Sequence, residues 1–232
     1  MALQLSRAMI ARIVPFAAFM LLLMLRGALP AGSTDAIATG AAIDARWVYG
    51  IGVLVVGGLL AWFWREYGEL VRQTRPSAGE TGAAAVAGLV VFALWIVLDA
   101  PWMRIGEASA SFVPVDAQGA LQWPLIAVRW IGATLLVPVM EELFWRSFLM
   151  RWIQSPRFEA VVPRQVGPKA IVLSTFVFML AHPLWLAAVI AGLVYAGLYV
   201  RTGKLWVPII AHAVTNGALG LWVVRTQQWA FW

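Results

Sequence analysis

Seven apolar stretches separated by short polar loops are the feature that most limits how this chain can fold. The stretches comprise residues 10–29, 47–64, 82–98, 123–153, 170–181, 184–200 and 205–224. About 20 apolar residues are enough for a helix to cross a bilayer. Only 12% of the residues are charged, against roughly 25% in soluble domains. The sequence therefore predicts an all-α fold, namely a polytopic transmembrane helical bundle with about seven membrane segments.

Residues 170–200 are too many for a single span. One helix of this length would measure roughly 46 Å, whereas the hydrocarbon core is about 30 Å thick. The dipeptide His182-Pro183 lies near the middle, and proline disfavours helical geometry in the residue before it. We therefore expect a short hairpin whose two legs turn near His182-Pro183.

Basic residues lie mainly at the ends of the apolar segments and concentrate in alternate loops. They include Arg7, Arg12, Arg65, Arg72, Arg75, Arg151, Arg157, Arg164 and Lys169. The positive-inside rule places these loops and the N-terminus in the cytoplasm. The formal charge of +6 is thus a topology signal, and no nucleic-acid partner is expected. Because the loops are short, we expect one membrane-embedded domain, residues 1–232, with its motifs in residues 123–224.

The start of the chain also resembles a signal peptide. Arg7 and Arg12 precede or open an apolar run that ends near Ala28-Leu29-Pro30-Ala31, a pattern of small residues typical of cleavage sites. Because Arg26 interrupts the approach to this site, we expect the first span to be retained.

Two adjacent glutamates, Glu141 and Glu142, interrupt the fourth apolar stretch, and Arg146 follows one helical turn later. A charged side chain at the centre of a bilayer costs about 2.5–3.5 kcal/mol on insertion scales. Two interpretations account for this cost. One is a buried ion pair that fixes helix packing, and the other is a catalytic site within the membrane.

Two further patterns have the same helical spacing. Phe178 precedes His182 by four residues, and His212 precedes Asn216 by four, so each pair shares one helical face. Counted from the basic residues that end their segments, Glu141 lies roughly 15 Å, His212 roughly 12 Å and His182 roughly 20 Å into the membrane. Residues from three segments are therefore expected to meet in one layer.

The chemistry of these residues suggests a role for each. Glu142 can pair with Arg146, which leaves Glu141 free to face a cavity as a general base. His182 can hold or shuttle the proton of a water molecule. His212 and Asn216 can donate hydrogen bonds to a developing oxyanion. These are the parts needed for attack of water on a peptide carbonyl, and they require no metal and no cofactor.

Each residue also has a purely structural interpretation. A single intramembrane histidine or asparagine, such as His182, His212 or Asn216, often forms a hydrogen bond between helices. Phe178 taken alone is a packing residue, and Arg146 can be an interfacial anchor. The occurrence of all three patterns in order and at one depth favours the catalytic interpretation.

With these motifs the chain resembles the CPBP family, the CAAX-protease and bacteriocin-processing group of intramembrane glutamic endopeptidases. The family signature corresponds to Glu141-Glu142 with Arg146, to Phe178 with His182, and to His212 with Asn216. The three motifs lie within residues 141–216, about a third of the chain.

The resemblance implies a membrane cavity in which Glu141 is the principal base and the histidine at 182 assists it. It also implies that His212 and Asn216 form the oxyanion hole. The expected substrate is a membrane protein or a lipid-anchored peptide in the bilayer, processed at a CAAX motif or a C-terminal sorting signal. We expect an integral protein of the bacterial inner membrane, with its N-terminus in the cytoplasm.

Three other functions remain open at this point. Two histidines and a glutamate could form a zinc protease, although the chain contains no His-Glu-x-x-His motif and no cysteine. Buried glutamate and histidine also mark transporters and proton relays, although the sequence shows no repeated halves. A scaffold or immunity-type protein with a relict site is the third.

Overall fold

The structure is a computed structural model, and it describes residues 6–27, 44–71, 75–106 and 112–232. The signal-peptide-like site at 28–31 lies outside the described residues. Within them, all the regular secondary structure is helical, apart from an isolated bridge between Val115 and Leu121. The predicted all-α class is confirmed.

Six described helices are long and apolar enough to cross a membrane. They are α1 (Arg7–Gly27), Ala45–Trp62 with α3 (Val48–Trp62), α5 (Ala78–Val97), the segment Trp123–Gln154, α10 (Trp185–Thr202) and α11 (Trp206–Thr226). A shorter apolar helix, α9 (Pro168–Leu180), precedes α10. Together they account for the seven segments that the sequence predicts.

The segment Trp123–Gln154 is not one uniform α-helix. It comprises α6 (Trp123–Ile131), the π-helix η4 (Gly132–Leu136), α7 (Val137–Glu142), the π-helix η5 (Leu143–Met150) and α8 (Arg151–Gln154). π-Helical turns are rare and occur frequently at functional sites. Two of them flank the short helix that carries both glutamates.

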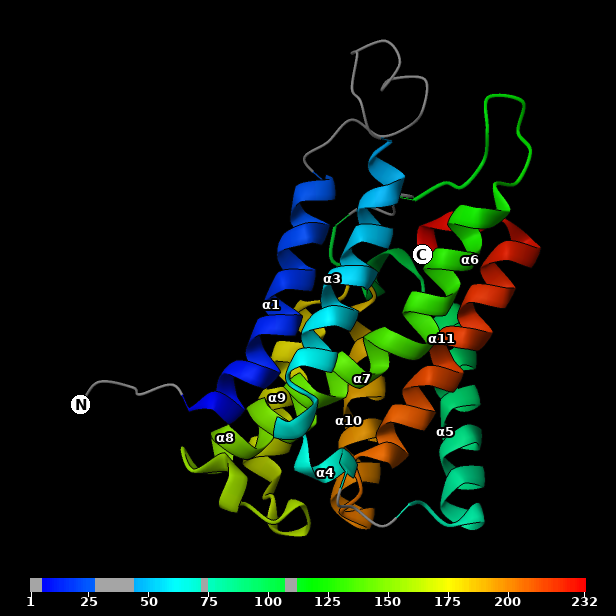
Figure 1. The fold of residues 1–232 in the computed structure, drawn as a ribbon. Coiled ribbons are helices and arrows are strands. Elements are labelled where there is room, and N and C mark those ends of the chain that lie inside the picture. Colours follow the sequence, from blue (N-terminus) through cyan, green and yellow to red (C-terminus); the bar gives the residue numbers. More distant parts are fainter. Residues whose placement is uncertain (1–5, 28–43, 72–74, 107–111) are drawn as a thin grey trace.

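Three pairs of helices lie side by side in the bundle, namely α1 with α3, α5 with α11, and α9 with α10 (Figure 1). The α9–α10 pair is the predicted hairpin, because α9 ends at Leu180 and α10 begins at Trp185. The backbone N–H of Ile105 donates to the carbonyl oxygen of Pro183 at 2.7 Å. The turn is therefore fastened to the loop after α5, near the 3-10 helix η3 (Pro101–Met103).

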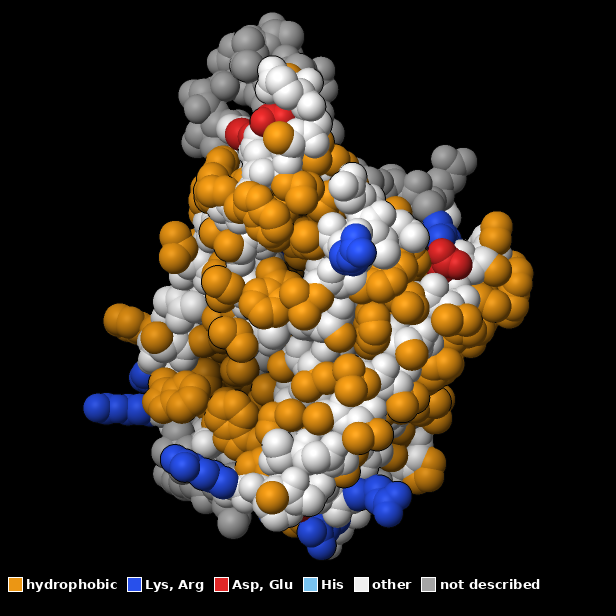
Figure 2. Space-filling model, turned by 90° about the vertical axis from the view of Figure 1, so that its right-hand side faces the viewer, with side chains coloured by type: hydrophobic (Ala, Val, Ile, Leu, Met, Phe, Trp, Pro, Cys, Tyr) orange, Lys and Arg blue, Asp and Glu red, His pale blue; other side chains and the backbone are white. Residues whose placement is uncertain are grey.

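The outer surface is suited to lipid. Figure 2 shows apolar side chains in a broad band across this face of the molecule, with Lys and Arg gathered mainly at its lower rim. Large apolar side chains point outward from the spans; Leu54 and Trp62 are both 77% exposed. Because such a surface is unfavourable in water, the band is expected to face hydrocarbon.

Helices α5 and α11 approach closely at Gly88. A Cβ atom there would collide with the carbonyl oxygen of Ala211 and lie 2.9 Å from Cβ of Val214. The hydroxyl of Thr215 donates to the carbonyl oxygen of Gly88 at 2.8 Å. A residue without a side chain is therefore required at this contact between two helices.

The substitution Gly88→Ala is expected to lower the unfolding free energy by about 1–3 kcal/mol, because overpacking forces the two backbones apart. The matched control is Gly82→Ala on the same helix, where a Cβ would meet nothing within 4 Å. Thermal unfolding in detergent measures both variants. Equal stability of the two would show that the close approach is not needed.

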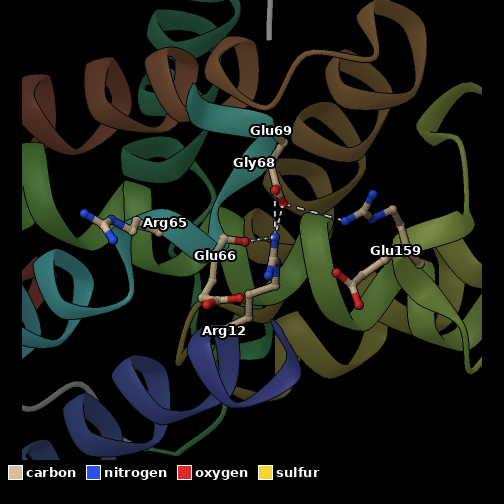
Figure 3. Close-up of a pocket in the computed structure, with 7 residues that line it drawn as sticks. Arg12, Arg65, Glu66, Gly68, Glu69 and Glu159 are labelled. Atoms are coloured by element: carbon tan, nitrogen blue, oxygen red, sulfur yellow. Dashed lines mark hydrogen bonds and ion pairs between the residues drawn. The ribbon is translucent and has the colours of Figure 1, made fainter. Parts of the chain in front are cut away.

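A buried charged cluster ties the lower end of the bundle together. Its centre is Glu69 on the short helix α4 (Gly68–Val71), whose carboxylate accepts hydrogen bonds from Arg12 at 2.6 and 2.7 Å and from Ser147. Arg151 lies 3.6 Å from the same carboxylate. In Figure 3, Arg12 and Glu69 point toward each other, whereas Arg65 points away. The cluster joins α1, α4 and η5.

The ionisation of Glu69 is expected to make stability depend on pH. Burial raises the pKa of its carboxyl, but the charge of Arg12 and the hydrogen bonds from Arg12 and Ser147 outweigh burial and lower the pKa. A lowered folded-state pKa adds stability above the unfolded value of about 4.3, and this stability is lost as the pH falls through the folded value. Thermal unfolding of wild type and Glu69→Gln across the acid range should show a smaller decline in the variant. An equal decline in stability of wild type and Glu69→Gln would contradict this prediction.

Candidate active site

A cavity of about 120 Å³ lies inside the bundle where the motif-bearing segments meet. Its walls are formed by Trp95, Glu141, Phe178, His182, Ala191, Tyr195, His212, Thr215, Asn216, Leu219 and Phe231. Four of the six predicted site residues are among them. They come from α7, from the α9–α10 turn and from α11. The fold therefore brings together residues that are up to 75 positions apart in the chain.

The two glutamates face different surroundings, because neighbouring helical residues point about 100° apart. Glu141 lines the cavity, whereas Glu142 has no exposed surface and is not part of the cavity wall. The Oε2 atoms of both carboxylates are buried and contact no hydrogen-bond donor among the described residues. For Glu141 this leaves an acceptor available to a molecule in the cavity.

Arg146 lies behind the cavity and holds three elements together. Its Nη1 donates to Oε1 of Glu142 at 3.1 Å, which confirms the pairing expected from the sequence. Its Nη2 donates to the carbonyl oxygen of Gly192 on α10 at 3.3 Å. The guanidinium carbon lies 4.7 Å from the ring centre of Phe178 and 5.4 Å from that of Tyr195. Phe178 thus contributes packing against the cation.

His212 is joined to the same carboxylate. Its Nδ1 lies 2.9 Å from Oε1 of Glu142, and its Nε2 is the ring nitrogen left for other contacts. Nε2 can donate only if it carries a hydrogen. Through the contact at Nδ1, Glu142, which also pairs with Arg146, fixes the orientation of the imidazole that lines the cavity.

His182 has a defined tautomer in its neutral form. Its Nδ1 lies 2.8 Å from the backbone carbonyl oxygen of Phe178. A carbonyl oxygen can only accept, so Nδ1 carries the hydrogen and Nε2 keeps its lone pair. The ring lies 4.3 Å from the ring centre of Phe178 and 5.7 Å from that of Trp95. His182 is therefore held in position with one nitrogen free to accept a proton.

Asn216 is oriented by the first π-helix. Its Nδ2 donates to the carbonyl oxygen of Ala133 in η4 at 2.9 Å. An amide nitrogen has two hydrogens, so one remains for the cavity that Asn216 lines. The irregular backbone before α7 thus fixes a polar group in the cavity that Glu141 also lines.

Two further residues support the site and were missed from the sequence. The ring of Tyr195 stacks on the imidazole of His212, with ring centres 5.0 Å apart and planes at 19°. Its hydroxyl donates to Oγ1 of Thr215 at 2.7 Å. The only sequence signal was a hydroxyl in each of two apolar segments, which is too common in membrane helices to identify a functional residue.

A metal site was one alternative from the sequence. Among the residues that the structure describes, no group of three or more histidine, aspartate or glutamate side chains is arranged to hold a metal ion.

Comparison with known protein families gives a match over part of the chain. Residues 122–218 match the family described as "Type II CAAX prenyl endopeptidase Rce1-like". These residues make up less than half of the chain, but they contain all three motifs. The match confirms the resemblance to CAAX-protease-related proteins over this segment. No curated protein and no solved structure gives a significant match.

Proposed function

We propose that this chain, whose residues 122–218 match the Rce1-like family of type II CAAX prenyl endopeptidases, is a glutamate-dependent intramembrane endopeptidase. The family match and the six long apolar helices already indicate an integral membrane protease. The catalytic type, the role of each residue and the substrate form the further part of the proposal.

One observation carries the proposal. Glu141, His182, His212 and Asn216 come from three separate segments and line one small cavity. The volume of about 120 Å³ is enough for several water molecules. An unpartnered carboxylate oxygen of Glu141 is buried at the site. A water molecule bound there would have an acceptor for the proton that it loses.

The first step is attack of this water on the carbonyl carbon of the scissile peptide bond. Glu141 takes the proton as the new C–O bond forms, and Nε2 of His182 offers a second acceptor. The carbonyl oxygen becomes an oxyanion. Nε2–H of His212 and the remaining N–H of Asn216 donate to it, in a site where few water molecules weaken the interaction.

The second step breaks the C–N bond. The oxyanion reforms a carbonyl, and the proton held by Glu141 passes to the leaving nitrogen. The products are a carboxylic acid and an amine, so no oxidant and no other reactant besides water is needed. The ring of Tyr195 and the Glu142–Arg146 pair keep His212 in place during both steps.

The substrate is proposed to be a membrane protein or a lipid-anchored peptide, cleaved near one terminus at a CAAX-type or sorting-signal site. It reaches the site within the bilayer, because the cavity lies among membrane-spanning helices. The basic lower rim supports an N-terminus in the cytoplasm. A bacterial inner membrane is the proposed location.

The test compares the intact termini of membrane and surface proteins in cells with and without the chain, by mass spectrometry. One class of proteins should gain an uncleaved terminal segment when the chain is absent. Unchanged termini, together with ion flux by the purified protein in liposomes, would favour a transporter instead. Cleavage that a chelator abolishes and zinc restores would establish a metalloprotease and overturn the glutamate mechanism.

A further inference from the structure

Part of the cavity wall is formed by residues outside the family-matched segment. Phe231 lies in the 3-10 helix η8 (Trp229–Phe231), which follows α11, and it lines the cavity together with Trp95 and Leu219. Helix η8 lies beside the C-terminus, near the label C in Figure 1, toward the opposite end of the bundle from the start of α1. With the N-terminus in the cytoplasm, this is the extracytoplasmic end.

The cavity is too small for a peptide in this state. Pockets that bind drug-sized ligands usually measure about 300–1,000 Å³, whereas this one measures about 120 Å³. A peptide segment needs at least the space of such a ligand. Some part of the wall must therefore move before a substrate can reach Glu141.

Among the described residues, helix η8 is held to the rest of the bundle by side-chain packing and not by hydrogen bonds to other elements. Its described backbone hydrogen bonds all stay within residues 227–232, and no described hydrogen bond joins it to another element. It is held by ring contacts, such as that between Phe231 and Trp222 at 5.1 Å. The chain enters it through Gln227, the only described non-glycine residue with a positive φ, at 56°. Such a conformation is uncommon for residues with a side chain.

We propose that Phe231 occupies the place of a substrate side chain, so that η8 is a displaceable plug and the cavity has a subsite for a large apolar residue. Leu219 follows Asn216 by three residues, or roughly 4.5 Å along α11. An extended peptide advances about 3.3 Å per residue. The subsite would thus receive the side chain one or two residues from the scissile carbonyl. The substrate assignment rests on the proposed function, whereas the plug does not.

Site-specific labelling tests the plug, because the chain contains no cysteine. The full-length variant Leu219→Cys is purified and exposed to a charged, membrane-impermeant methanethiosulfonate. Adding Phe231→Ala should speed labelling at least about tenfold, because labelling follows the population of the open cavity. Phe231→Leu, which keeps an apolar plug, should give a smaller increase. Phe176→Ala on α9 is the matched control, because Phe176 is 51% exposed and does not line the cavity.

Equal labelling rates with and without Phe231→Ala would overturn the proposal, and so would an equal increase from Phe176→Ala. Thermal unfolding of each variant shows that labelling reports the cavity rather than general unfolding.

A second measurement uses membrane-anchored peptides that differ only in the residues beside the cleavage site, with Phe, Ala or Asp there. We expect a preference for Phe and a higher kcat/KM in Phe231→Ala. Faster labelling without cleavage by any variant would support the plug and contradict the proposed function. Cleavage without any response to Phe231→Ala would support the protease and overturn the plug.

Discussion

The substitution Glu141→Gln is expected to reduce cleavage about a thousandfold while the protein stays folded. Glutamine has nearly the same shape but cannot accept a proton, and a positioned general base contributes roughly 10²–10⁴ to a rate. The unpartnered Oε2 of Glu141 shows that the carboxylate has no hydrogen bond from the described residues to lose at that atom. The rate of appearance of the cleaved terminus, measured with purified protein in liposomes, gives the comparison.

The matched control is Glu159→Gln at the lower end of the bundle, where the side chain is exposed and lines a separate polar pocket. This variant should retain wild-type cleavage. If Glu141→Gln also retained it, Glu141 would not be the base, and the function of the cavity would have to be assigned to other groups.

The largest effect on stability is expected from Glu142→Leu. The substitution leaves Arg146 buried without its carboxylate, and breaking a buried ion pair costs about 3–5 kcal/mol. Adding Arg146→Met replaces the pair by apolar groups of similar size and should recover most of this stability. Activity should stay low in the double variant, because His212 has lost the carboxylate at its Nδ1.

Thermal unfolding and cleavage are measured for wild type, Glu142→Leu, Arg146→Met and the double variant, which together form a double-mutant cycle. Recovery of cleavage together with stability would mean that Glu142 and Arg146 serve packing alone. Loss of stability that is merely additive would mean that the two side chains do not interact.

The large-scale fold follows from local features of the sequence. Apolar length predicts the spans, and Pro183 predicts the turn of the hairpin, because both effects act within a few residues. The spacing of Glu142 and Arg146 predicts their pairing for the same reason. The depth estimate for Glu141, His182 and His212 also agrees with their common cavity, since helix rise per residue is nearly constant.

Other parts of the site depend on contacts between distant segments and could not be predicted in this way. In the π-helix η4, the carbonyl oxygen of Ala133 accepts a hydrogen bond from Nδ2 of Asn216 on α11. Tyr195 belongs to the site because it contacts His212 and Thr215 on another helix. Phe231 lines the cavity only because the chain reverses after α11. No pattern within one segment encodes these contacts.

The number of residues in the π-helix η5 sets the directions in which its side chains point. Arg146 and Ser147 are neighbours, yet one contacts Glu142 and the other contacts Glu69 at the lower end of the bundle. A π-turn contains more residues than an α-turn, so it changes the direction in which successive side chains point. Deleting one residue from Leu143–Met150 would rotate one of these contacts away from its partner. The contact at Glu142 and the contact at Glu69 therefore both depend on the number of residues in η5.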